Sequence, residues 1–132
     1  MNQMNFTLKQ TIQEIESWKK TLVFLQHENL LQKDKLVEIL KNSNGKAEDL
    51  LEIAEGYQNQ FLRQDETFRL MWKDLTKLER SLLEDPGIND HYEKQVNHWI
   101  KRLSKELRIL DTNSIELKKD FNRFLDICFT EN

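Results

Sequence analysis

Apolar residues recur every three or four positions along three long stretches of the chain, and polar residues fill most of the positions between them. This spacing places the apolar side chains along one stripe of a helix, which is typical of coiled-coil packing. The pattern therefore predicts three long helices, each with a narrow buried seam. The predicted seam residues are Ile15, Trp18, Leu22, Leu25, Leu36, Ile39, Leu50, Ala54, Tyr57, Phe61, Phe68, Met71, Leu75, Leu78, Leu82, Val96, Ile100, Leu103, Leu107, Leu110, Leu117, Phe121, Phe124 and Cys128.

Two short polar segments, residues 42–45 and 84–90, separate the three stretches and predict chain reversals. The first segment holds a glycine and two asparagines, residue types that readily end a helix in the left-handed conformation. In the second, Pro86 cannot continue a helix, and Asp90 with Glu93 reads as a capping box that starts the next one. We therefore expect helix ends close to these two segments.

Connections this short make neighbouring helices antiparallel, so the sequence predicts an all-α, antiparallel, up-down-up three-helix coiled-coil bundle. Residues 1–132 form a single domain in this interpretation, since no linker or repeat divides them. The alternative is four helices with a break near Asp111 to Ser114, where four residues that favour helix caps follow one another. We favour one continuous or mildly kinked helix, because Leu107 and Leu117 stay in phase across that site.

Counting outward from the two reversals places residue i of the first helix opposite about residue 90 minus i of the second. Trp18 then lies level with Trp72, and both lie within one turn of Trp99. The same count predicts a polar layer at mid-bundle, formed by Asn29, Gln32, Gln64, Asn113 and Ser114. We interpret this layer as a device that specifies register, because buried amides find partners in only one alignment. The functional alternative is a small-ligand site at the polar layer or at the tryptophan cluster.

The first helix has more apolar residues than one seam can bury, because a helix in such a bundle buries only a third to half of its circumference. The surplus residues are Val23, Phe24, Leu30, Leu31, Val37 and Leu40. Burying each of these side chains contributes roughly 1.5 to 3 kcal/mol. An exposed patch of this kind favours association, so we expect it to contact a protein partner or a second copy of the chain.

The amino-acid composition limits the class of protein and the kinds of partner that are expected. A chain with 38% hydrophobic and 33% charged residues is typical of a water-soluble domain. Its net charge of −3 makes nucleic acid an unlikely partner, since binding to a phosphate backbone needs basic excess. No apolar run reaches about 18 residues, so no membrane-spanning helix is expected. The first residues lack a signal-peptide pattern, which favours a cytoplasmic location.

Motifs that carry chemistry are missing from the sequence. It contains no glycine-rich phosphate loop, no Gly-x-Ser-x-Gly and no Glu-x-x-His pair of the kind that di-iron bundles use. The histidines are His27, His91 and His98; His91 and His98 are seven residues apart, too far to share one metal ion, and we interpret all three as surface residues. Cys128 has no second cysteine with which to form a disulfide. We therefore predict no catalytic, cofactor-binding or metal-binding residues, and no enzyme activity.

Residues 50–66, Leu-Leu-Glu-Ile-Ala-Glu-Gly-Tyr-Gln-Asn-Gln-Phe-Leu-Arg-Gln-Asp-Glu, together with the preceding Asn-Ser-Asn-Gly of residues 42–45, resemble small uncharacterised helical proteins of bacteria. The resemblance covers about 25 residues. It implies a bacterial cytoplasmic origin and no particular activity. The sequence as a whole predicts a non-catalytic protein-protein interaction module, a scaffold, adaptor or assembly factor, that associates with itself.

Overall fold

The computed structural model describes residues 2–42, 48–84 and 90–130, and the side chains of residues 8–42, 50–84 and 92–128. Helix α1 spans Asn2–Asn42, α2 spans Glu48–Glu84 and α3 spans Asp90–Thr130. All of the described backbone is helical, so the prediction of three helices and no strand is confirmed for this part of the chain. Residues 43–45 and 85–89 of the two predicted reversals, and the side chain of Asp90 that was predicted to cap α3, lie outside the described residues.

Helix α3 continues through Asp111 to Ser114 without a break. The alternative with a fourth helix is therefore wrong. Leu110 and Leu117, which flank the four cap-favouring residues, are both buried. Their burial offsets the weak helix preference of the segment between them, because packing of an apolar face outweighs local propensity in most helices.

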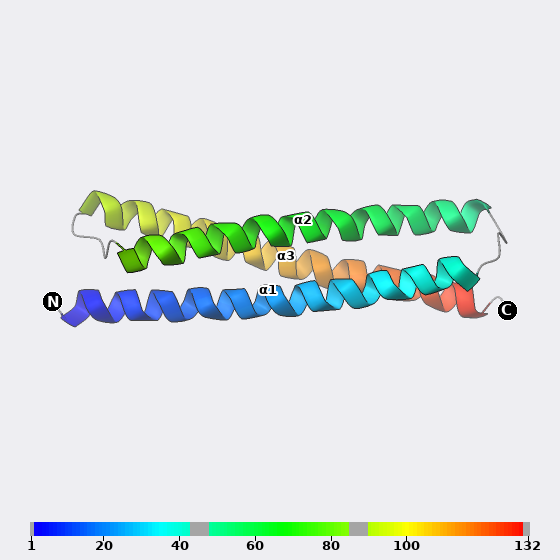
Figure 1. The fold of residues 1–132 in the computed structure, drawn as a ribbon, viewed down its shortest axis with the longest axis horizontal. Helices are drawn as coiled ribbons and strands as arrows, with labels where there is room; N and C mark the ends of the chain where they lie inside the picture. Colours follow the sequence, from blue (N-terminus) through cyan, green and yellow to red (C-terminus); the bar gives the residue numbers. More distant parts are fainter. Residues whose placement is uncertain (1, 43–47, 85–89, 131–132) are drawn as a thin grey trace.

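The three helices lie side by side along one long axis (Figure 1). Helix α2 runs back along α1, and the ion pairs follow this course: Lys19 Nζ lies 3.1 Å from Glu79 Oε1, and Lys33 pairs with Asp65 further along. Helix α3 crosses the pair at a shallow angle, so that its first half lies near the end of α2 and its last turns lie near the end of α1.

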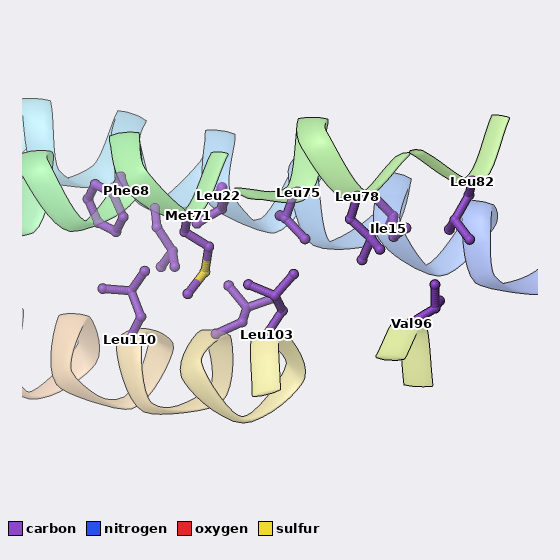
Figure 2. Close-up of a cluster of buried hydrophobic side chains, with 12 residues drawn as sticks. Ile15, Leu22, Phe68, Met71, Leu75, Leu78, Leu82, Val96, Leu103 and Leu110 are labelled. Carbon is purple, nitrogen blue, oxygen red and sulfur yellow. The ribbon is translucent and has the colours of Figure 1, made fainter. Parts of the chain in front are cut away.

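A leucine-rich cluster fills the half of the bundle that contains the start of α1 and of α3. Figure 2 shows Leu110 of α3 facing Phe68 of α2, and Leu103 facing Met71 and Leu75. The buried members of this cluster are Ile15, Leu22, Leu25, Phe68, Met71, Leu75, Leu78, Leu82, Val96, Leu103, Leu107 and Leu110.

A smaller aromatic cluster fills the other half. The Phe121 ring packs edge-on against Phe61 with centroids 5.0 Å apart and against Tyr57 at 5.3 Å. Its buried members are Leu36, Ile39, Ala54, Phe61, Leu117, Phe121, Phe124 and Leu125. Every residue predicted for the seam is buried or half-buried, and Leu125 is a core residue that the spacing did not predict.

Candidate interaction face and mid-bundle polar layer

The outer face of α1 carries five large apolar side chains that are open to solvent. Phe24 is 59% exposed and Leu30 48%, and Val23, Leu31 and Val37 are similarly exposed. We call these five residues the α1 patch. Leu40, the sixth residue predicted for this surface, is only half-exposed and packs against the aromatic cluster. Leu40 lies four residues after buried Leu36, so it is on the seam side of α1 and takes part in the core.

The α1 patch is built from two adjoining stripes. Val23, Leu30 and Val37 follow one another at intervals of seven residues, which are two helical turns, so they share one line along the helix. Phe24 and Leu31 form a second line about a quarter of a turn round the helix. Exposed His27 and Asp34 lie between the two lines. The patch is thus apolar with one basic and one acidic group on its centre line.

Asn29 is the central residue of the polar layer. Its side chain is 4% exposed, and its amide nitrogen donates hydrogen bonds to the Phe61 carbonyl oxygen at 3.0 Å and to Asp65 Oδ1 at 2.7 Å. Lys33 donates to the other carboxylate oxygen of Asp65. The two helices are therefore joined by a buried amide and a partly buried ion pair at one level, between the two apolar clusters.

The other predicted members of the polar layer are less tightly held. Gln32 is buried, but its Oε1 atom accepts no hydrogen bond from a described residue, and Ser114 Oγ likewise has no described partner. Gln64 is half-buried and Asn113 is exposed. Glu28 and Lys118 form an ion pair of 3.1 Å between α1 and α3 close to this level.

Sequence reasoning missed the charged residues that hold this level together. Lys33 comes four residues after Asn29, and Asp65 four residues after Phe61, so both lie at the edges of their seams. Edge positions of coiled coils often carry opposite charges that pair between helices. Residues of opposite charge at matching levels along the edges of two predicted seams are the signal that indicates such pairs.

The predicted tryptophan cluster does not include all three rings. Trp18 and Trp99 are half-buried against the leucine-rich cluster, whereas Trp72 is 38% exposed. Lys19 Nζ lies 5.0 Å from the centroid of the Trp72 ring, which is within the range of a cation–π contact. The contact with Lys19 places Trp72 at the predicted level beside Trp18, but the ring lies at the solvent-exposed edge of the α1–α2 contact.

Helices α2 and α3 leave an open groove of about 450 Å³ between them. Gln64 and Asn113, two residues predicted for the polar layer, line it together with Arg63, Thr67, Leu70, Met71, Asp74, Glu106, Ile109 and Leu110. None of these lining residues belongs to α1. The two amides therefore face the α2–α3 side of the bundle, whereas Asn29 faces the contact between α1 and α2.

The surroundings of Tyr57 and of Glu66 displace the pKa of each of these groups. Burial raises the pKa of the Tyr57 phenol, the nearby Asp120 carboxylate adds to this rise, and Arg123 opposes it. The Tyr57 hydroxyl donates a hydrogen bond to the Asp120 carbonyl oxygen at 3.2 Å. On the surface of α2, hydrogen bonds from Arg69 hold the pKa of Glu66 below its usual value. The Tyr57 shift comes from packing of α2 against α3, and the Glu66 shift comes from an ion pair within α2.

Among the described side chains, no three His, Cys, Asp or Glu residues lie close enough together to hold a metal ion. None of the described helix segments combines the length and the apolar character needed to cross a membrane. No family model, no curated protein and no solved structure matches this chain. The case for a function therefore depends on the α1 patch, the polar layer and the groove.

Proposed function

We propose that this protein is a non-catalytic interaction module of the cytoplasm: an antiparallel three-helix coiled coil that associates with itself through the α1 patch and serves as a scaffold, adaptor or assembly factor. The observation that carries the proposal is the exposure of five large apolar side chains on one face of α1. Contiguous apolar surface of this kind marks association sites in soluble proteins.

The order of residues in the α1 patch supports a second copy as the partner. In a symmetric dimer one surface meets itself, so residue i contacts residue j and j contacts i. Two α1 helices that cross in opposite directions, with the two-fold axis between Leu30 and Leu31, bring each line of the patch against the same line of the other copy, so that Leu30 meets Leu30 and Val23 meets Val37. The same arrangement brings His27 opposite Asp34. The apolar and polar groups of the patch are therefore complementary to themselves.

The polar layer supports a role in presenting this surface. Asn29 and Lys33 lie on the inner side of α1, immediately behind Leu30 and Leu31. Their contacts with Asp65 fix the position of α1 along α2. A slip of α1 along α2 would leave a buried amide and a partly buried ion pair without partners, which costs about 1–3 kcal/mol per group. The layer thus favours one position of the α1 patch relative to the rest of the bundle.

Sedimentation of the full chain tests the proposal. The wild-type protein should contain species of at least twice 16.0 kDa, and Leu30→Glu should shift the distribution to lower mass while helical content stays the same. Leu62→Glu is a matched control, because Leu62 on α2 is 51% exposed and lies outside the patch. A wild-type protein whose association is unchanged by Leu30→Glu would contradict a role for the α1 patch.

A further inference from the structure

The groove between α2 and α3 is a second unpartnered surface, separate from the α1 patch. Its floor is formed by Met71 and Leu110, which belong to the leucine-rich cluster. Its sides include Leu70 and Ile109, which are about half exposed. The groove is therefore an apolar surface that is open to solvent and continuous with the core beneath it.

Opposite charges mark the two ends of the groove on α2. Arg63 and Asp74 are eleven residues apart, which is three helical turns, so they lie on one face of α2 about 16 Å apart along the axis. Arg63 is exposed and Asp74 half-buried, and neither forms an ion pair with a described residue. The side chains of Thr67 and Leu70 lie between them.

Helix α3 adds a second acidic group to one end. Tyr92 of α3 hydrogen-bonds Ser81 of α2, and Tyr57 hydrogen-bonds Asp120, so later residues of α3 meet earlier residues of α2. Glu106 consequently lies toward Asp74, and Asn113 lies toward Arg63. Glu106 has an exposed i,i+4 contact with Arg102 at 3.6 Å, a kind of pair that holds a carboxylate only weakly. The groove thus has an acidic end and a basic end.

We propose that this groove is a self-association surface that binds the same groove of a second copy, face to face, so that Arg63 of each copy meets Asp74 of the other. A two-fold axis that lies between the two faces, perpendicular to the helices, brings the basic end of one groove onto the acidic end of its mate. It also brings the Leu70 and Ile109 regions of the two copies together at the centre.

Charge selects this arrangement over the other face-to-face dimer. A two-fold axis parallel to the helices would place Asp74 of one copy against Glu106 of the other, and like charges that face each other across an interface are unfavourable. With the perpendicular axis, Arg63 of each copy faces Asp74 of the other, which gives two pairs of opposite charges per dimer. A short groove with one basic and one acidic end is therefore complementary to itself in one orientation.

The groove and the α1 patch are on different helices, so a chain that uses both assembles beyond a dimer. This separation allows each surface to be tested alone. A Leu30→Glu background removes association through the α1 patch and leaves the groove unchanged. Association that persists in this background reports on the groove, whatever the fate of the proposal about α1.

Sedimentation equilibrium in the Leu30→Glu background is the test. We expect a dimer of twice 16.0 kDa whose dissociation constant rises roughly tenfold or more with Arg63→Glu, and again with Asp74→Arg, because each reversal turns two attractions into two repulsions. Combining Arg63→Glu with Asp74→Arg should restore the dimer. Arg80→Glu is the matched control for Arg63→Glu, since Arg80 is exposed on α2 outside the groove and its replacement changes the net charge by the same amount. Circular dichroism verifies that each variant keeps its helical content.

Three outcomes would overturn the proposal. The Leu30→Glu protein could be monomeric at every concentration, in which case the groove does not bind a second copy. The single charge reversals could leave the dimer as tight as the Arg80→Glu control. The combined variant could remain as weak as the single ones, which would show that Arg63 and Asp74 do not face each other.

Discussion

The two halves of the bundle core are built differently. The leucine-rich cluster has twelve buried residues, mostly aliphatic, that repeat along all three helices. The aromatic cluster has eight, and four rings, those of Tyr57, Phe61, Phe121 and Phe124, contact one another in edge-on and tilted arrangements.

Aliphatic side chains repeated every heptad pack almost as well after a slip of seven residues. Rings in edge-to-face contact lose their packing after such a slip, because they need a specific relative orientation. We infer that the leucine-rich half contributes most of the buried apolar area, whereas the aromatic half specifies the axial alignment of the helices.

The polar layer lies at the boundary between these two halves. Asn29 and Asp65 connect α1 to α2 there, between Leu25 of one cluster and Leu36 of the other. Its buried amide has partners in one alignment only, so it adds to the register that the aromatic rings specify. The leucine-rich half then extends that alignment along the remaining length of the helices.

Truncation of one fully buried side chain in each half should give the largest difference. Phe121→Ala removes a ring that contacts three others, and should lower the free energy of unfolding by about 3–5 kcal/mol. Leu103→Ala, at an equally buried position in the leucine-rich cluster, should cost about 2–4 kcal/mol, because no ring contacts are lost. Urea denaturation of the full chain measures both changes.

The exposed Ile115 provides the control for this pair, since Ile115→Ala should change stability by less than about 0.5 kcal/mol. If Leu103→Ala costs as much as Phe121→Ala or more, the ring geometry contributes nothing beyond apolar area. The contrast between the two halves would then be one of composition alone.

Replacing the polar layer should have a smaller effect on stability and a larger one on uniqueness. Asn29→Leu leaves the Asp65 carboxylate facing an apolar side chain and should cost about 1–3 kcal/mol. Adding Asp65→Leu should recover part of that loss, because the carboxylate no longer faces an apolar side chain, while Lys33 loses its ion-pair partner. The double variant should also show mixed oligomers or broadened amide spectra, as alternative registers become accessible. A double variant that keeps a single oligomeric state and sharp amide signals would show that the aromatic cluster specifies register without help.

The sequence predicted the axial arrangement well for a physical reason. Two short polar segments, one with Gly45 and one with Pro86, limit where helices can end, and the observed ends at Asn42 and Glu84 lie beside them. The heptad spacing then assigned the inner side of each helix. Asn29 contacts Phe61, as counting from the first reversal predicted, so residue numbers alone were enough to find the level of the polar layer.

Angular position around each helix was harder to predict, because one residue changes the angle by about 100°. Trp72 was expected to be buried beside Trp18 and lies at that level, yet its ring is at the solvent-exposed edge of the α1–α2 contact, with Lys19 over it. Leu40, expected on the outer face of α1, packs against the aromatic cluster for the same reason. The groove between α2 and α3 depends on how far two helices separate, which no spacing within one helix encodes.

The smallest expected effect concerns the pH response of the aromatic half. The phenol pKa of Tyr57 is raised in the folded protein, chiefly by burial, so folding favours the neutral phenol. The stabilisation from this group is fully present below the unfolded pKa of about 10 and is lost as pH rises through the folded value. Stability of the wild-type protein should therefore fall at high pH, whereas Tyr57→Phe, which cannot ionise, should lose less. Near neutral pH the same variant should cost under about 1 kcal/mol, because it loses one exposed hydrogen bond to Asp120.

Ultraviolet titration of tyrosinate in a Tyr92→Phe background measures this pKa directly, since Tyr57 is then the one remaining tyrosine of the two in the chain. Arg123 opposes the shift, so Arg123→Ala should raise the Tyr57 pKa further. Asp120→Asn should lower it, because the carboxylate charge is lost while the Asp120 carbonyl that accepts the hydrogen bond is retained. A Tyr57 that titrates like a free tyrosine in all of these variants would mean that the ring lies in water, and that the aromatic cluster is held by Phe61, Phe121 and Phe124 alone.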